Sequence, residues 1–564
     1  MTPDPTSAAT TPAAAPADAS GAMLTTPTGS SLQRLADAAW ERTGDAARLV
    51  FEGREWTGTE LGLRTRRLSR GLRAAGLEPG DRVVVMMANC PEVGVTYGAT
   101  WRAGGVVTPV LFLLSEPELR HVLADGGAAL AVTTPEFLPK VVAAAAGVGT
   151  LRAIVVAGAD AAGLAAAAEQ AGRPVLDLAE LESGPEGDLV DADPASPGAL
   201  LYTGGTTGRS KGVVLSHDAL SASAWGAVRT TVESGDRGAD EVLLVPLPLS
   251  HVYGLMINVA GMHTPTGRQS VLMRWFDAAG FLELVQRHRV TSASVVPSMI
   301  QLLLQQPLED YDLGSLRRVG SGAAPLPREV AEEFVRRVPG AQVGEGYGCT
   351  ETAGLISASP IDRYRPGSVG TPAAGMTVRI ELPDGSEAAT GQDGEITVRG
   401  PGVMTGYWNA PEETAQALRG GWLHTGDVGH LDEDGYLYVV DRMKDLVIRG
   451  GFNVYPRDVE EAMLAHPDVV AAAVVGRPDT TLGEEVVAYV QLRPGATANE
   501  PDLVAHGKEL LSAAKYPREV HVLDAVPLTS VGKLDRKALR QRARQAGAST
   551  TFDAGGGSRS TGSP

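Results

Sequence analysis

Two hydrophobic periods recur along the first part of the chain. Apolar residues return at the three- and four-residue spacing of a helix within residues 32–39 and again within 61–72, and the Gly- and Pro-containing stretch 76–80 ends the second helix. Two short segments around Gly53 predict strands, and the unbroken apolar run 82–87 is typical of a strand buried on both faces.

Segments with helical spacing and strand-like segments then alternate along the chain. Helical spacing within 92–103 and 116–125 is interleaved with strand-like segments at 106–110 and 129–132. Strands and helices in alternation predict an α/β fold with largely parallel sheets.

Residues 445–540 have a different pattern. Strand-like segments at 469–475, 485–492 and 519–523 occur there together with two helical segments. This mixture predicts a compact α+β domain beside the larger α/β part. The Ala/Thr/Pro-rich residues 1–27 and the low-complexity residues 544–564 are expected to be disordered tails.

Composition narrows the class of protein. The 564 residues, 43% of them hydrophobic, suffice for about three to four domain-sized units. The chain has 67 acidic and 49 basic residues, a net charge of −18, which argues against nucleic acid or an anionic membrane as the main partner. Only Cys90 and Cys349 are present, and we find neither a membrane-length apolar run nor a secretory signal, so we expect a cytoplasmic protein without a transmembrane segment.

One stretch, Tyr202 to Gly212, carries the clearest chemistry. Glycines and threonines crowd residues 203–208, and Lys211 follows between apolar, strand-like flanks. Glycine backbone N–H groups approach anions closely, threonine hydroxyls bind phosphate oxygens or Mg²⁺, and lysine brings a compact positive charge. The spacing is not that of a Walker A loop. A surface linker is the alternative, but the apolar flanks favour a phosphate site.

For three further segments, a functional role and a purely structural one must also be compared. His251 lies among apolar residues and is by default a packed core residue, and Ser321–Leu326 is by composition a simple turn. The stretch Gly344–Thr352 is more specific, because its glycines allow the backbone to lie against a flat base and Tyr347 offers a face for stacking. In it, Thr350 can reach an α-phosphate, and Glu351 is the oxygen ligand we assign to Mg²⁺, a solvated surface Glu being the alternative.

These motifs, in this order, resemble the adenylate-forming (AMP-binding) superfamily of acyl-CoA synthetases, peptide-synthetase adenylation domains and firefly-type luciferases. The resemblance covers about residues 30–543. This chain has Gly204 where the family usually has serine, and Ser210 where proline is common. A glycine N–H can replace the missing hydroxyl as a donor.

The resemblance implies a fold and a domain order. It implies a large N-terminal domain, residues 28–441, of two α/β subdomains and a β-rich subdomain. A hinge at residues 442–446 is then followed by a small, mobile α+β lid domain at 447–543, with Lys444 as the pivot.

The resemblance also assigns roles to residues. His251 would position the substrate carboxylate, and the acyl pocket would be formed by His251, Tyr253, Gly254 and Gly322. Asp427 and Arg442 would bind the ribose, and Lys533 would bridge the carboxylate and the α-phosphate. Catalysis would depend on Lys533, His251, Thr206 and Glu351, with Thr206 and Glu351 as the Mg²⁺ ligands, and Gly450 and Gly451 would line the tunnel for the CoA thiol. The residues expected to bind ATP are Thr203, Gly204, Gly205, Thr206, Thr207, Gly208, Lys211, Gly322, Ala323, Ala324, Gly346, Tyr347, Gly348, Thr350, Asp427, Arg442 and Lys533.

The reaction this implies is ATP-dependent activation of a carboxylic acid to acyl-AMP, with transfer to CoA. Residues 247–257 contain no carboxylate to pair an α-amino group, so amino acids are poor candidates. Medium- to long-chain fatty acids are expected first and aryl or aryl-propenoic acids second. The alternatives are loading of a carrier protein acting in trans and, from another class, a luciferase-like monooxygenase. Retention of Lys211, Glu351 and Lys533 argues against a non-catalytic nucleotide sensor.

Overall fold

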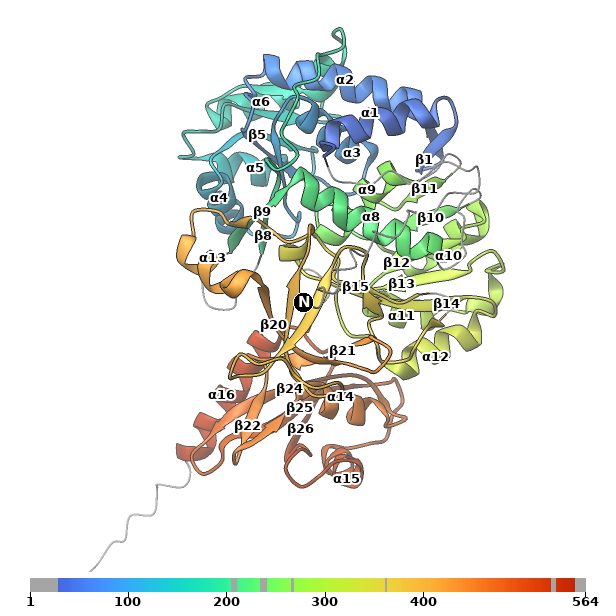
Figure 1. Cartoon of the computed structure of the whole chain (residues 1–564), viewed down its shortest axis with the longest axis vertical. Coiled ribbons are helices and arrows are strands. Elements are labelled where there is room, and N and C mark those ends of the chain that lie inside the picture. The colour runs from blue at the N-terminus through green and yellow to red at the C-terminus, as the bar shows by residue number, and fades with distance from the viewer. Residues whose placement is uncertain are drawn as a thin grey trace, which may run out of the picture.

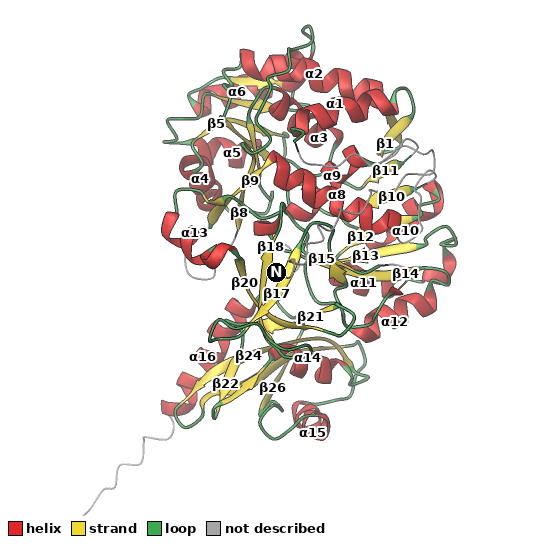
Figure 2. Cartoon of the chain, viewed as in Figure 1, coloured by secondary structure: helices red, strands yellow, loops and turns green. Residues whose placement is uncertain are grey.

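The computed structural model describes residues 29–203, 210–233, 241–264, 268–360, 363–528 and 534–552 (Figure 1). Within these ranges no helix has both the length and the apolarity that crossing a membrane requires. The expected N-terminal tail lies outside them. Four sheets form the architecture (Figure 2).

The first sheet has eight strands in the order β19-β9-β8-β4-β3-β5-β6-β7 and is parallel from β8 to β7. β9 and β19 add an antiparallel edge. The strands are β3 (Arg82–Met86), β4 (Val106–Pro109), β5 (Ala128–Thr133), β6 (Ala153–Val156), β7 (Val175–Asp177), β8 (Pro197–Thr203), β9 (Lys211–Ser216) and β19 (Gly406–Tyr407). The helices between them in sequence are α3 (Pro91–Arg102), α4 (Glu116–Asp125), α5 (Leu138–Ala145), α6 (Ala161–Ala171) and α7 (Leu178–Glu182).

The second sheet has nine strands in the order β16-β15-β14-β13-β12-β10-β11-β1-β2, with a parallel centre from β14 to β1. Its strands are β1 (Ala47–Phe51), β2 (Arg54–Thr57), β10 (Val242–Val245), β11 (Gln269–Leu272), β12 (Ser292–Val295), β13 (Arg318–Ser321), β14 (Gln342–Tyr347), β15 (Ser357–Ala358) and β16 (Thr371–Pro372). The accompanying helices are α1 (Leu32–Thr43), α2 (Gly58–Ala74), α8 (His217–Glu233), α9 (Val252–His263), α10 (Ala278–His288), α11 (Pro297–Leu304) and α12 (Arg328–Arg337), with short 3₁₀ turns η1 (Leu308–Asp310) and η2 (Thr350–Thr352).

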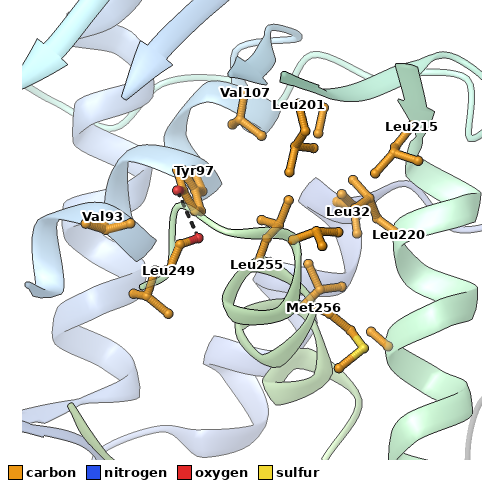
Figure 3. Packing of buried hydrophobic residues seen from close by; sticks show 14 of the residues in the cluster. Leu32, Val93, Tyr97, Val107, Leu201, Leu215, Leu220, Leu249, Leu255 and Met256 are labelled. Carbon is orange, nitrogen blue, oxygen red and sulfur yellow. Dashed lines mark hydrogen bonds between the residues drawn. The ribbon is translucent and has the colours of Figure 1, made fainter. Parts of the chain in front are cut away.

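One apolar core joins these two α/β layers. Leu201 of β8 and Leu215 of β9 meet Leu255 and Met256 of α9, all buried, as Figure 3 shows. Nearby, the hydroxyl of the buried Tyr97 donates a hydrogen bond of 3.3 Å to the carbonyl of Leu249 (Figure 3). The shared core fixes the two sheets relative to each other.

A third, antiparallel sheet of β17 (Thr377–Glu381), β18 (Gly394–Arg399), β20 (Leu423–Leu431) and β21 (Leu437–Arg442) lies between the α/β layers and the C-terminal domain (Figure 2). The short α13 (Pro411–Ala417) and η4 (Arg419–Gly421) precede β20.

The C-terminal domain, drawn in orange to red in Figure 1, follows β21. Its five-stranded sheet contains β22 (Val447–Arg449), β23 (Phe452–Val454), β24 (Val469–Asp479), β25 (Gly483–Leu492) and β26 (Glu519–Leu523), packed with α14 (Pro456–Leu464), α15 (Glu500–Leu510) and α16 (Arg536–Phe552). The predicted mixed α/β fold with a small α+β C-terminal domain is confirmed.

One expectation differs from the structure. Helix α16 continues to Phe552, although we expected disorder from residue 544. Its buried Leu539 and Ala543 anchor the helix on the sheet through Val475 and Val487. Low sequence complexity therefore did not mean disorder at this position.

Candidate functional site

A cleft of about 2030 Å³ lies where the two α/β layers, the third sheet and the C-terminal domain meet. Its lining includes the residues that directly follow β13 and β14, which are the carboxyl ends of parallel strands. Ligands of open α/β sheets bind at such ends. Most of the predicted site residues that the structure describes line this cleft.

Asp427 is the best-defined group in the cleft. Its side chain is buried, and its Oδ2 accepts a hydrogen bond of 2.6 Å from the Tyr347 hydroxyl. Its Oδ1 lies 3.0 Å from Nε of Arg442 in an ion pair. Asp427 and Arg442 are Cα partners in the β20–β21 ladder, so the strand register places them side by side. A carboxylate held in this way has lone pairs left for sugar hydroxyls.

Glu351 lies in η2 beside Tyr407. The Tyr407 hydroxyl donates a hydrogen bond of 2.9 Å to Oε1 of Glu351. Burial and this carboxylate raise the pKa of Tyr407, which keeps the hydroxyl protonated as a donor. Lys211, the first residue of β9, lies with its Nζ 3.6 Å from Oε1 of Glu413 and 5.4 Å from the ring centroid of Tyr407. Lys211 and Glu351 both lie near Tyr407 and line the same cleft.

This donor set fits a Mg²⁺ ion that arrives with a nucleotide. The described residues contain no group of three His, Cys, Asp or Glu side chains that could hold a metal alone. Glu351 supplies one carboxylate, and Mg²⁺ in proteins commonly takes one or two carboxylates, with water and phosphate oxygens completing its coordination.

His251 and Tyr253 begin helix α9 at the cleft wall. Nδ1 of His251, the N-cap residue, accepts a hydrogen bond from the Tyr253 backbone N–H. The Tyr253 ring lies against Gly322, where a Cβ atom would come within 3.2 Å of the ring. Gly254 is different, because it is buried with its α-carbon against the Pro248 carbonyl and does not line the cleft. Gly254 allows close packing and, in this structure, does not form the pocket wall.

From Gly322 the cleft continues as a channel along one face of the second sheet, the face on which Ser294, Gly320 and Gly344 lie, which we call the front face. Side chains alternate between the faces of a strand, and the register aligns Ser294, Gly320 and Gly344 as one row across β12, β13 and β14. These small residues leave room on this face for the Tyr253 side chain, whose hydroxyl donates a hydrogen bond of 3.5 Å to the Gly320 carbonyl and lies 3.7 Å from the place of a Cβ on Gly320. Apolar side chains of α8 and α9, including Met256, line the same cleft.

The channel has a polar end. One row further from Gly322 the aligned front residues are Ser292, Arg318 and Gln342. Arg318 and Arg268 each donate a hydrogen bond of 3.0 Å to the buried Glu241. Gly322 lies four positions after Arg318, so the floor between them is about 13 Å long.

The C-terminal domain closes the cleft through α14. The Arg457 backbone N–H donates a hydrogen bond of 3.0 Å to Oδ2 of Asp441, and the Arg457 guanidinium donates one of 2.5 Å to the carbonyl of Val439. Both acceptors belong to β21, on the N-terminal side of Lys444. Arg457 therefore holds α14 against the third sheet in the domain arrangement of this structure.

Glu345 is a buried carboxyl near this junction that the sequence reasoning did not single out. Burial raises its pKa to about 7, an effect that Arg457 opposes. Its Oε2 accepts a hydrogen bond of 3.4 Å from the backbone N–H of Leu326. Tyr407 was also missed as a Glu351 partner, since the two are 56 residues apart and only the folded chain brings them together.

The remaining predicted residues divide into three groups. Thr203, Ala323, Ala324, Gly346, Gly348, Thr350 and Lys444 line the cleft. Gly450 and Gly451 lie in the exposed β22–β23 turn with positive φ angles of 57° and 83° and do not line it. Gly204, Gly205, Thr206, Thr207, Gly208 and Lys533 lie outside the described residues.

Comparisons with known proteins agree with this geometry. The family model described as AMP-binding enzyme matches residues 36–408, and that of the AMP-binding enzyme C-terminal domain matches residues 458–533. A feruloyl-CoA synthase of an Amycolatopsis species is 38% identical over 507 residues, 87% of this chain and 94% of the relative. A long-chain-fatty-acid–CoA ligase of Bacillus subtilis strain 168 is 33% identical over 545 residues, 90% of this chain and 94% of the relative.

A solved structure shows the same likeness in three dimensions. The crystal structure of ATP-bound MatB from Rhodopseudomonas palustris has a TM-score of 0.79 and 32% sequence identity, and the match covers 92% of this chain and 100% of that one. The chain therefore belongs to the AMP-binding enzyme family, and within it to the adenylate-forming acid–CoA ligases.

Proposed function

We propose that this enzyme activates a medium- to long-chain fatty acid with MgATP and transfers the acyl group to CoA, with an aryl or aryl-propenoic acid as the second candidate substrate. The observation that carries the proposal is the continuity of one cleft from Asp427 and Glu351 to the channel over Gly320. A nucleotide and an acyl chain would meet at Gly322 and His251.

In the first half-reaction, the substrate carboxylate attacks the α-phosphorus of ATP, and pyrophosphate leaves. Asp427 and Arg442 hold the ribose, and Tyr347 stacks on the base. Glu351, and Thr206 by its motif, would hold Mg²⁺, which would neutralise charge on the phosphate oxygens. Residues 203–208 with Lys211 hold the β- and γ-phosphates, and Lys533 bridges the carboxylate and the α-phosphate. The protein positions the reactants and stabilises charge, so no covalent enzyme intermediate is required.

In the second half-reaction, the CoA thiol attacks the acyl-AMP carbonyl, and AMP leaves. In the structure the Gly450–Gly451 turn is exposed and outside the cleft. We propose that residues 442–446 form the hinge between domains 28–441 and 447–543, and that rotation about Lys444 exchanges the Lys533 segment for this turn. The rotation would break both contacts between Arg457 and β21.

The channel supports an apolar acid of limited length. Its α8 and α9 side presents Met256, Ile257 and Ala260, which suit an alkyl or aryl group. An alkyl terminus that reached the Arg318 row would remove water from a charged group without replacing its hydrogen bonds, which is unfavourable. We therefore expect the preferred acid to end before that row.

Product analysis by mass spectrometry tests the proposal. The enzyme is incubated with MgATP and a panel of fatty, aryl and amino acids, with and without CoA. Acyl-CoA that forms only with CoA, together with AMP, supports it. Acyl-AMP that accumulates and does not react with CoA would instead indicate that a carrier-protein thiol is the acceptor. Absence of both products for every acid would contradict acid activation itself.

A further inference from the structure

Helix α4 contacts both sides of the hairpin from which the phosphate-binding stretch extends. β8 and β9 are antiparallel neighbours, and their last pair is Thr203 with Lys211. Residues 204–209 connect these ends, so the position of the ends limits where the stretch can present its N–H and hydroxyl groups. We call Tyr202, Thr203, Ser210 and Lys211 the neck.

On the β8 side, the neck is held in place by contacts of Tyr202. Its hydroxyl donates a hydrogen bond of 2.6 Å to Oδ2 of Asp125, the last residue of α4. The Tyr202 ring also lies over Gly212, its partner on β9, where a Cβ would come within 3.2 Å of the ring. Burial and the Asp125 carboxylate raise the pKa of Tyr202, so the hydroxyl remains a donor.

On the β9 side, the neck is held in place by His121 of α4. Its Nε2 lies 2.9 Å from the backbone carbonyl of Ser210. A carbonyl only accepts, so Nε2 carries the hydrogen and donates. The His121 ring also makes an edge contact with Tyr202, with ring centroids 5.8 Å apart. His121 and Asp125 are four residues apart on α4 and therefore lie on one face, one helical turn apart.

The helix that provides these contacts is itself fixed. Ser115 and Glu118 form a capping box at its start. At its end, the Trp408 indole donates a hydrogen bond of 3.0 Å to the carbonyl of Asp125, and the Trp408 backbone N–H donates one of 2.7 Å to the carbonyl of Gly212. The same tryptophan thus joins α4 to β9.

We infer that His121 and Asp125 are positioning residues for the binding of the β- and γ-phosphates, because they hold both sides of the neck from one rigid helix. This rests on the proposed function, in which residues 203–211 hold the pyrophosphate part of ATP. Neither side chain needs to touch the nucleotide. Loss of either contact would let one side of the neck move. This would weaken the binding of the β- and γ-phosphates without weakening the binding of AMP or of the acid.

The test compares ligands that differ only in these phosphates. In His121→Ala, the KM for MgATP in acid-dependent ATP–pyrophosphate exchange should rise about three- to tenfold, the effect expected for one net hydrogen bond. The inhibition constant of pyrophosphate should rise by the same factor. The inhibition constant of AMP and the KM for the acid should stay unchanged, because neither ligand uses the neck.

Matched variants separate positioning from general damage. His121→Gln keeps a side-chain N–H donor and should restore most of the MgATP affinity, and Tyr202→Phe should resemble His121→Ala. His288→Ala, a histidine at the distant end of α10, should match the wild type. Melting temperatures without ligand report whether each variant is folded.

Three results would overturn the inference. The first is an unchanged KM for MgATP in a folded His121→Ala, and the second is a loss of AMP affinity equal to the loss of MgATP affinity in that variant. The third is a His121→Gln variant that does not restore the MgATP affinity, together with a wild-type KM for MgATP that varies with pH as a histidine gains and loses its charge. The last would indicate direct charge contact with the phosphates. No exchange in the wild type with any acid would instead contradict the proposed function.

Discussion

The Tyr347 hydroxyl donates a 2.6 Å hydrogen bond to Asp427 across 80 residues of sequence. It joins the end of β14, in the second sheet, to β20, in the third. Arg442 pairs with the other carboxylate oxygen. The group proposed to bind ribose is therefore oriented from both sides before any nucleotide arrives, so little ordering of this side chain is required on binding.

Asp427→Asn should weaken nucleotide binding. The amide keeps the shape and one acceptor, but it loses the charge that pairs with Arg442, and its NH₂ faces donors. We expect the KM for ATP to rise at least about tenfold, since hydrogen bonds to a charged group contribute about 1.5–3 kcal/mol. ATP–pyrophosphate exchange measures this, with Asp434→Asn in the exposed β20–β21 turn as the control. Equal effects of the two variants would contradict the assignment.

Glu345→Gln should change how stability depends on pH. Burial raises the Glu345 pKa to about 7 from 4.5, and Arg457, Glu461 and Tyr364 are the charged or titratable groups coupled to it. The folded protein then binds a proton more tightly than the unfolded chain, so the wild type loses stability as pH rises from about 4.5 to about 7.

In Glu345→Gln this contribution is absent. Its stability relative to the wild type should therefore grow through that pH range and level off above it, by an amount on the order of 3 kcal/mol. Thermal melts of the two proteins at a series of pH values measure the difference. A difference that does not vary with pH would show that Glu345 does not titrate in this range.

Gly320→Val should shorten the acyl channel. A Cβ atom at this position would lie 3.7 Å from the Tyr253 hydroxyl, so the two γ-carbons of valine would crowd Tyr253 and obstruct the floor. We expect kcat/KM to fall more than about tenfold for the longest accepted acids and to change little for short ones. Gly314→Ala, in the turn before β13, is the control. Parallel loss for short and long acids would mean that the chain does not run over Gly320.

Lys533→Ala should separate the two half-reactions. Lys533 lies outside the described residues, so this prediction comes from its motif. Removing the ammonium group should greatly reduce acyl-AMP formation from acid and MgATP while sparing acyl-CoA formation from supplied acyl-AMP and CoA. Single-turnover assays of each step measure this. Equal loss of both steps would contradict a rotation that withdraws Lys533 before thioester formation.

Elements with strong local signals were predictable from the sequence. The prediction of a helix at 116–125 is confirmed, and it begins where Ser115 and Glu118 form a capping box. The strand at 519–523 is confirmed as β26. These boundaries depend on residues within a few positions of each other.

What could not be predicted depends on register between distant segments. No local pattern shows that Tyr347 meets Asp427, that Tyr407 meets Glu351, or that α14 faces Glu345. Gly254 illustrates the same limit. Its neighbours His251 and Tyr253 line the cleft, and one step further round the helix Gly254 packs against Pro248 instead. Helical phase relative to a partner decides this, and the motif does not contain it.

One face of β12, β13 and β14 packs in a hydrophobic core, and the other lines the cleft. This difference affects how such an enzyme evolves. Ala293, Val319 and Val343 on the back face are buried in a core with α10, α11 and α12. Ser294, Gly320 and Gly344 on the front face line the cleft and are absent from that core. Mutations that alter the accepted acid therefore fall where few contacts are lost. New substrate preferences can arise in single steps without prior stabilising mutations, because the positions under selection are not those that hold the sheet together.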